Sequence, residues 1–125
     1  MEQCKGLSTQ VCKDEVIVAG STALTDIEAT RFRRGAARIN YMAQDRPDLS
    51  VASRILSQGM SSPTVNDEVR LKRVIRYLKV HPRCLNFMAW QSDSQMLSLL
   101  VDSDWAGEKA GRKSCSGGCI RNGKH

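Results

Sequence analysis

The chain has 125 residues, of which 41% are hydrophobic and 26% are charged, enough for one small globular core but not for a multidomain enzyme. Lysine and arginine outnumber aspartate and glutamate by 19 to 13, and this basic balance predicts a polyanionic partner without identifying it. Aromatic residues make up only 5%, which argues against a base-stacking platform of the kind that single-strand binders use.

Nothing in the sequence predicts a membrane segment or a secretory signal. No apolar run approaches the ~20 residues that a transmembrane helix needs, and residues 1–13 lack the apolar stretch of a signal peptide. The five cysteines are odd in number and irregularly spaced, which fits a reducing compartment. We therefore expect an intracellular protein, cytoplasmic or nuclear, without a membrane partner.

The chain is expected to begin with a flexible lead-in over residues 1–23 and to continue with a helix. Thr25 followed by Glu28 is a capping-box pattern, and apolar residues recur at helical spacing through residue 44. Gly35 lies inside this stretch, where it lowers helix propensity and suggests close packing or a bend.

Two further helices are expected before residue 83. Pro47 ends the first helix and opens the second, which Gly59 is placed to end as a left-handed cap. The third helix covers residues 65–80, where one apolar stripe recurs at helical spacing. Basic side chains occupy much of its remaining surface: Arg70, Lys72, Arg73, Arg76 and Lys79.

After residue 83 the hydrophobic period changes from about 3.6 to about 2. The pattern predicts a strand over residues 85–90, a mostly apolar and therefore buried strand over 96–102, and a third strand over 114–122 that is kinked by its two glycines. Helices followed by strands indicate an α+β fold, with about three helices before an incomplete antiparallel sheet.

Two carboxylates lie at the end of the second expected strand. Asp102 and Asp104 are two residues apart, so both point to the same face of a strand. Hard oxygen ligands on a rigid element suit a Mg²⁺ ion, and two-metal phosphodiester chemistry uses such carboxylates to place its ions. A solvated strand end would carry the same residues, so the pair alone does not establish a metal site.

Two basic segments are candidates for contact with nucleic acid. The five cations of the third helix could each neutralise a phosphate, and Arg112 and Lys113 precede a Gly/Ser-rich turn whose amides could cradle one. Residues 31–83 hold 12 basic and 4 acidic residues, an excess of eight positive charges that strengthens this interpretation. A solvated helix face and an ordinary basic hairpin turn are the alternatives.

Three segments stand out as motifs: residues 33–49 (RRGAARINYMAQDRPDL), residues 71–79 (LKRVIRYLK) and residues 102–118 (DSDWAG, followed by RKS and SGG). In this order and at similar spacing, they resemble LNYLAQDRPDL, LKRVLRYLKG and SDADWAGD…RRSTSGG of copia-type retrotransposon Pol polyproteins. The resemblance covers about residues 24–125.

In that family the first two segments lie in the thumb and connection region at the end of the reverse transcriptase, and the third opens a ribonuclease H-like domain. The resemblance therefore implies a thumb-like helical region over residues 24–83 and the first strands of a truncated ribonuclease H-like domain over 84–125. It also implies that Asp102 binds Mg²⁺, with Asp104 as a secondary candidate, and that the third helix tracks the phosphates of a duplex.

The sequence departs from the family in ways that bear on activity. The YxDD palm motif is absent, the remaining ribonuclease H carboxylates would lie beyond His125, and Cys115 replaces the usual threonine. One aspartate cannot hold two metal ions, so we expect no catalysis by this chain alone and no tight Mg²⁺ binding. The expected role is weak, non-specific contact with a duplex or an RNA–DNA hybrid, together with the rest of the polyprotein. A basic interaction module and a decayed element relic without activity are the alternatives.

Overall fold

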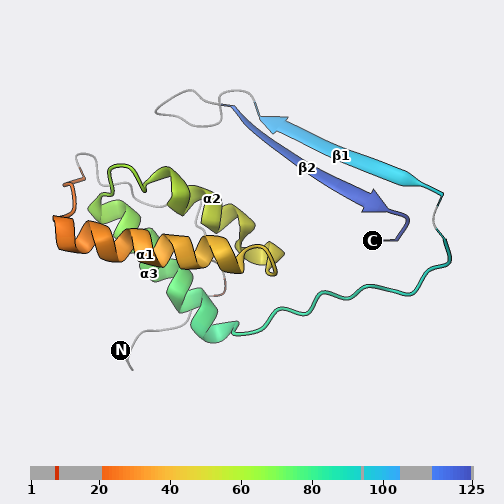
Figure 1. Cartoon of the computed structure of the whole chain (residues 1–125), viewed down its shortest axis with the longest axis horizontal. Coiled ribbons are helices and arrows are strands. Elements are labelled where there is room, and N and C mark those ends of the chain that lie inside the picture. The colour runs from red at the N-terminus through yellow and green to blue at the C-terminus, as the bar shows by residue number, and fades with distance from the viewer. Residues whose placement is uncertain (1–7, 9–20, 94, 105–113, 125) are drawn as a thin grey trace. The chain divides into compact units, whose positions relative to one another are not determined.

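The computed structural model describes residue 8 and residues 21–93, 95–104 and 114–124 (Figure 1). Within these residues, three α-helices and one short 3₁₀ helix precede two antiparallel strands, which confirms the predicted α+β class. The chain divides into two compact units, Met1–Cys84 with the helices and Leu85–His125 with the strands.

The first helix, α1, spans Asp26–Met42 and begins at the predicted capping box. The Glu28 carboxylate accepts hydrogen bonds from the Thr25 amide (3.1 Å) and the Thr25 hydroxyl (2.7 Å). The bond from the hydroxyl lowers the pKa of Glu28. Because these bonds satisfy groups that the helix itself leaves free, they fix the residue at which α1 starts.

The short 3₁₀ helix η1 (Pro47–Leu49) leads into α2 (Ser50–Gln58), so Pro47 does open the second helical segment. Gly59 ends α2 with a φ of −81°, and the predicted left-handed cap is therefore wrong. A Cβ at Gly59 would lie 2.7 Å from Cγ of Asp67. The glycine is required by this close approach and not by the backbone conformation.

The third helix, α3, spans Val65–Val80 as predicted. The Asp67 carboxylate accepts hydrogen bonds from the Thr64 amide (2.9 Å) and hydroxyl (2.7 Å), which repeats the capping arrangement of α1. A Cβ at Gly35 in α1 would lie 2.7 Å from Cδ2 of Leu71, so the close packing predicted at this glycine is confirmed.

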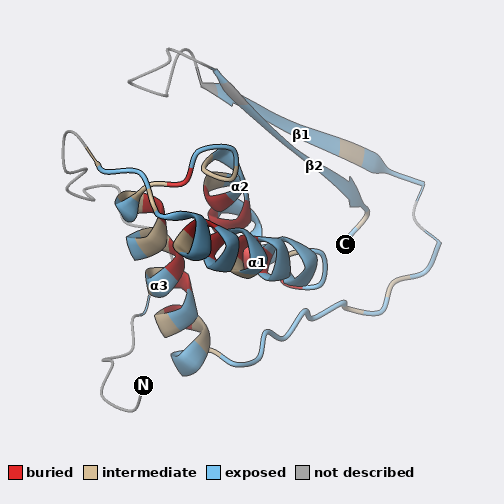
Figure 2. Ribbon diagram, turned by 60° about the vertical axis from the view of Figure 1, so that its left-hand side comes forward, coloured by how far each residue is buried: buried red, intermediate tan, exposed pale blue. Residues whose placement is uncertain are grey.

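The helical unit has a continuous core between its three helices (Figure 2). Complete burial of a leucine, valine or phenylalanine side chain contributes about 1.5–3 kcal/mol to folding, so a few such residues hold the unit together. The core consists of Phe32, Ala36, Ile39, Leu49, Ala52, Leu56, Leu71, Val74 and Tyr77.

The last residues of the predicted lead-in are attached to this unit. The Leu24 amide donates to the Pro63 carbonyl (3.0 Å), and the Val65 amide donates to the Thr22 carbonyl (3.1 Å). Apart from residue 8, the lead-in before residue 21 lies outside the described residues. None of the helices in the described ranges is long and apolar enough to cross a membrane.

The second unit is a two-stranded antiparallel sheet of β1 (Leu97–Asp104) and β2 (Cys115–Asn122). The two strands correspond to the second and third predicted strands. Leu97 pairs with Asn122 and Asp104 pairs with Cys115, and the pairing continues without interruption through the two glycines of β2.

Two expectations about this unit are wrong. Residues 85–90 form no strand in the structure. Their alternating hydrophobicity is typical of a strand, but a strand also needs a neighbouring strand with which to pair, and the pattern does not provide one. The strand β1 is not buried: Leu99 is 64% exposed and Val101 is 74% exposed. The described residues of this unit form a sheet of two strands, which by itself buries little apolar surface.

Candidate nucleic-acid interface

The predicted contact residues of α3 lie next to acidic residues of the same helix. Arg70 forms an ion pair with Asp67 (Nη1 to Oδ1, 3.1 Å), and Lys72 forms one with Glu68 (Nζ to Oε1, 3.0 Å). Lys72 is exposed, and an ion pair of an exposed side chain is worth less than about 1 kcal/mol, so a phosphate could replace the Glu68 carboxylate. Asp67 is buried and holds Arg70 more firmly. The acids nevertheless reduce the positive potential that this part of α3 presents to a ligand.

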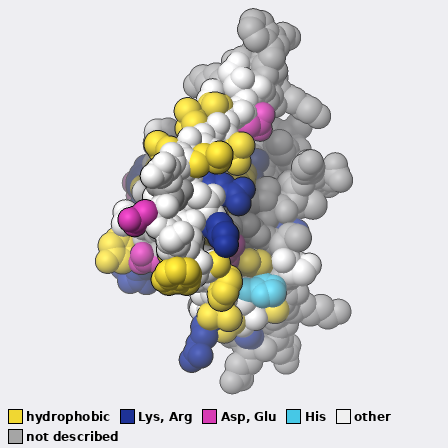
Figure 3. All heavy atoms as spheres, turned by 90° about the vertical axis from the view of Figure 1, so that its right-hand side faces the viewer, with side chains coloured by type: hydrophobic (Ala, Val, Ile, Leu, Met, Phe, Trp, Pro, Cys, Tyr) yellow, Lys and Arg dark blue, Asp and Glu magenta, His cyan; other side chains and the backbone are white. Residues whose placement is uncertain are grey.

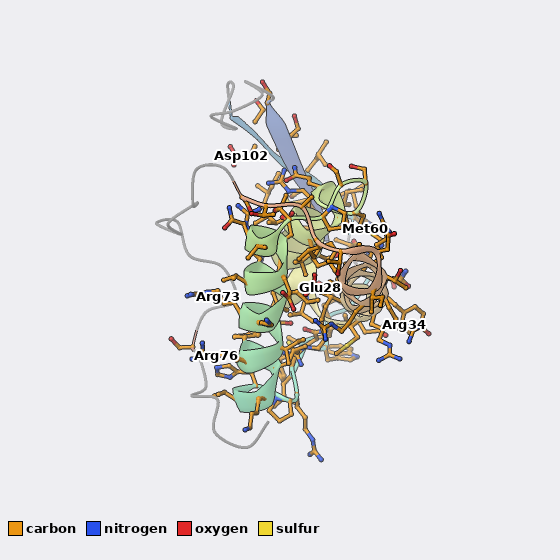
Figure 4. All side chains as sticks on the ribbon, turned by 90° about the vertical axis from the view of Figure 1, so that its left-hand side faces the viewer. Glu28, Arg34, Met60, Arg73, Arg76 and Asp102 are labelled. Carbon is orange, nitrogen blue, oxygen red and sulfur yellow. The ribbon has the colours of Figure 1, made fainter. Side chains whose placement is uncertain are left out.

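Arg73 and Arg76 lie on the side of α3 that faces away from α1 (Figure 4). Both are half-buried, whereas Lys79 is exposed in the last turn of the helix. A cation in the last turn interacts favourably with the helix dipole. Arg73, Arg76 and Lys79 therefore lie further along α3 than Arg70 and Lys72, which pair with the two acids of its first turn.

A polar network that sequence reasoning missed joins the start of η1 to the end of α3. The buried Arg46 donates from Nη2 to Asp48 (2.6 Å) and from Nη1 to the His81 carbonyl (2.9 Å). The Tyr77 hydroxyl donates to the same Asp48 carboxylate (2.9 Å). The Tyr77 and His81 rings stack with centroids 4.7 Å apart.

The protonation of this network follows from its hydrogen bonds. The bond from Arg46 lowers the pKa of Asp48, and the bond to Asp48 raises the pKa of Tyr77 and that of Arg46. The carboxylate is therefore held ionised and the phenol protonated. Arg46 and Asp48 belong to the motif over residues 33–49, and Tyr77 belongs to the motif over 71–79. The hydrogen bonds of Asp48 therefore join the two motif segments in the folded chain.

The helix α1 carries further arginines that were not selected from the sequence. Arg31 pairs with Glu68 (3.2 Å), and Arg33 donates to the carbonyl of Met60 (2.9 Å). Arg34 and Arg38 are exposed. Their spacing of four residues was visible in the sequence and places them on one face of α1.

The strand carboxylate Asp102 is exposed, and its cross-strand partner is Gly117. Apart from the glycine and its two neighbours, no atom of the described residues lies within 4 Å of the place where a Cβ at Gly117 would be, so this part of the strand pair is open among them. Asp104 is the last residue of β1, and Arg112 and Lys113 lie outside the described residues.

A Mg²⁺ site needs several oxygen ligands. Nowhere in the described part of the chain do three or more His, Cys, Asp or Glu residues come together in a way that could hold a metal ion. The described residues thus offer the exposed carboxylate of Asp102 to an ion and do not complete a ligand set around it.

Curated relatives of the chain include three proteins of Arabidopsis thaliana. The retrovirus-related Pol polyproteins from transposons RE1 and RE2 are each 36% identical to it, over 83% and 78% of this chain. An uncharacterized mitochondrial protein is 36% identical over 70% of this chain and 36% of its own length. No protein-family model matches the chain, and no solved structure matches it.

The chain spans only 7% of the length of each of the two Pol polyproteins. The similarity nevertheless extends through most of this chain, and it agrees with the three motif segments noted in the sequence. The chain therefore belongs to the copia-type retrotransposon Pol polyprotein family and corresponds to a short segment of such a polyprotein.

Proposed function

We propose that this chain supplies a phosphate-contacting helical surface to a retrotransposon Pol polyprotein, and that it binds a duplex or an RNA–DNA hybrid weakly and without sequence preference. The observation that carries the proposal is the excess of eight positive charges over residues 31–83, which lie in the helical unit. The similarity to a retrovirus-related Pol polyprotein is in line with such a surface.

The geometry of the helical unit supports backbone contact over base recognition. Its cations project from helices that share one buried core, so their spacing is fixed. Contacts to phosphates position a protein on a duplex but carry no sequence information. Some of the cations are engaged by acids of the protein, as Arg70 and Lys72 are, which favours weak binding.

A salt titration tests this function. Binding of the chain to a labelled RNA–DNA hybrid is measured by fluorescence anisotropy at about 50 and about 200 mM salt. Two to four phosphate contacts predict that the affinity falls roughly 10- to 100-fold between these concentrations, because each contact releases counterions. An affinity that ignores salt, or that is undetectable at the lower concentration, would contradict the proposal.

We also propose that Asp102, with Asp104 as a second candidate, contributes to the Mg²⁺ site of a ligand set completed by other parts of a Pol polyprotein. The parent activities would be RNA-directed DNA synthesis and hybrid cleavage. The open surface next to Asp102 supports this role. A site completed by other parts of the polyprotein would leave this chain inactive alone. Mg²⁺-dependent hybrid cleavage by this chain, abolished in Asp102→Asn, would show instead that it is a nuclease.

A second candidate function is protein interaction. The observation that favours it is the exposure of apolar side chains on the strands, where Ile120 is 69% exposed and Leu97 is 72% exposed. Figure 3 shows hydrophobic side chains at the surface of the face that it views. Large exposed apolar patches mark protein-binding surfaces. Nucleic-acid retention that stays unchanged after charge reversal on both helices, by Arg73→Glu with Arg76→Glu and by Arg34→Glu with Arg38→Glu, would favour this candidate.

A further inference from the structure

We propose that the outward face of α1, formed by Arg34, Arg38 and Tyr41, is the main phosphate-contacting surface of the helical unit, in preference to the cations of α3. This inference rests on the proposed binding of nucleic acid. It assigns that binding to residues of the motif over residues 33–49 that were not among the contact residues predicted from the sequence.

The three side chains form one stripe along the helix. Arg34 and Arg38 are four residues apart and Tyr41 follows three residues later, so all three project from the same face. At a rise of 1.5 Å per residue, the stripe covers about 10 Å along the helix axis. A duplex strand presents a phosphate about every 3.4 Å along its axis, so the stripe is long enough for about three phosphates.

The positive charge of this stripe is available to a ligand. Arg34 and Arg38 are exposed, and neither engages in a hydrogen bond or an ion pair within the described part of the chain. Tyr41 is 73% exposed, and its hydroxyl is of a type that donates to phosphate oxygens. The sequence from residue 34 to residue 44 contains no aspartate or glutamate, so no acid of this segment offsets the charge.

Two other arginines of α1, in contrast, are engaged by groups of the protein itself. Arg31 is held by Glu68, and Arg33 donates to the carbonyls of Met60 (2.9 Å) and Ser61 (3.3 Å). These two residues therefore help to hold the helices together. Among the described residues, Arg34 and Arg38 make no such contacts, which leaves ligand contact as a use for them.

The two basic faces point in different directions. Figure 4 shows Arg34 on the side of α1 that faces away from α3, and it shows Arg73 and Arg76 on the side of α3 that faces away from α1. A single rigid duplex cannot lie along both faces at the same time. A duplex must therefore bind one face or the other, and matched substitutions on each face show which one it binds.

The experiment compares two variants of the full chain with the same loss of charge. The first is Arg34→Gln with Arg38→Gln, and the matched control is Arg76→Gln with Lys79→Gln. Binding to a labelled RNA–DNA hybrid of about 20 base pairs is measured over a series of salt concentrations. The α1 variant should bind at least about 10-fold more weakly at about 50 mM salt, with a salt slope smaller by about two, because each lost contact removes about one unit of slope. The control should change by less than about 3-fold.

A conservative variant separates charge from structure. Arg34→Lys with Arg38→Lys keeps both charges and should bind within about 3-fold of the wild type, and circular dichroism should show the wild-type helix content in all variants. Equal losses in both glutamine variants, or a loss confined to the control, would overturn this inference while leaving the proposed function intact.

Two further measurements test whether the proposed function itself fails and whether the arginine face binds a different ligand. A wild-type chain that does not bind the hybrid at all would contradict the proposed function as well as this inference. A polyglutamate chain is titrated under the same conditions as the hybrid. Tighter binding of polyglutamate than of the hybrid would assign the arginine face to an acidic protein and overturn the inference.

Discussion

Gly59 and Asp67 touch where α2 ends and α3 begins. The backbone at Gly59 has a φ of −81°, which any residue can adopt, but a Cβ there would lie 2.7 Å from Cγ of Asp67. That carboxylate cannot move away cheaply, because it accepts hydrogen bonds from Thr64 and pairs with Arg70. We therefore predict that Gly59→Ala destabilises the protein by about 1–3 kcal/mol in urea unfolding, as overpacking does elsewhere.

The cause of this loss can be isolated with a second substitution. In an Asp67→Ala background the carboxylate that obstructs the new methyl group is gone, so the cost of Gly59→Ala should fall to near zero. This coupling is measured by a double-mutant cycle. Costs that simply add would show that the close contact with Asp67 is not the reason for the glycine.

The Arg46–Asp48–Tyr77 network fixes the end of α3 against the loop that follows α1. Asp48→Asn weakens the bond from Arg46 and leaves a buried guanidinium without its charged partner, so we predict a loss of about 2 kcal/mol. Tyr77→Phe removes one hydrogen bond to the carboxylate and should cost about 1 kcal/mol. Urea unfolding near neutral pH measures both, and a neutral Asp48→Asn substitution would show that the network does not contribute to stability.

The same network predicts how stability depends on pH. The pKa of Asp48 is lowered in the folded chain, so its contribution is present above the unfolded value of about 4 and is lost as the pH falls through the folded pKa. The pKa of Tyr77 is raised, so its contribution is complete below about 10 and is lost as the pH rises through the folded pKa.

The variants used for unfolding also test this pH dependence. The free energy of unfolding of the wild type should fall more steeply below about pH 4 than that of Asp48→Asn. It should likewise fall more steeply above about pH 10 than that of Tyr77→Phe. Parallel curves for the wild type and both variants would contradict the assignment of these losses to the network.

At the level of elements, the helices were predictable because their signals are local. Thr25 and Thr64 each lie three residues before the carboxylate that completes a capping box, so a short window of sequence contains the whole device. The strand pattern over residues 85–90 was equally clear but predicted a strand that does not form. A strand depends on a partner from elsewhere in the chain, and local alternation cannot supply one.

The candidate site shows the same limit. The ion pairs of Asp67 with Arg70 and of Glu68 with Lys72 join residues three and four apart, so their spacing was visible in the sequence. The sequence could not join Arg46 to His81, which is 35 residues away, because such contacts depend on tertiary packing. The exposed arginines Arg34 and Arg38 could have been found from their spacing alone.

The strand pair should be the less stable element of the described chain. A two-stranded sheet is marginally stable in water, and the exposed apolar residues of β1 add little burial. We predict that amides of β1 and β2 exchange with solvent far faster than the core amides of α1 and α3, as measured by hydrogen exchange followed by NMR. Equal protection of strands and helices would show that the strands are covered by another part of the chain or by a second copy.

At the scale of the whole molecule, the two units differ in what holds them together. Residues such as Phe32 and Leu49 are almost fully buried in the helical unit, whereas the cross-strand pair Leu99 and Ile120 remains largely exposed. An exposed apolar strand with a free edge promotes association between molecules. The chain should therefore aggregate through its strands while its helices stay folded.

This expectation can be tested by changing the cross-strand pair to opposite charges. Leu99→Glu with Ile120→Lys places an ion pair at facing positions, which keeps the strands compatible while removing two exposed apolar side chains. Light scattering at increasing protein concentration should show clearly less aggregation than in the wild type. The melting of the helices, followed by circular dichroism at 222 nm, should be unchanged, because the helical core contains no residue of either strand. A lower melting temperature of the helices would mean that the apolar strand face packs against the helical unit, and the division of stability between the two units would then be wrong.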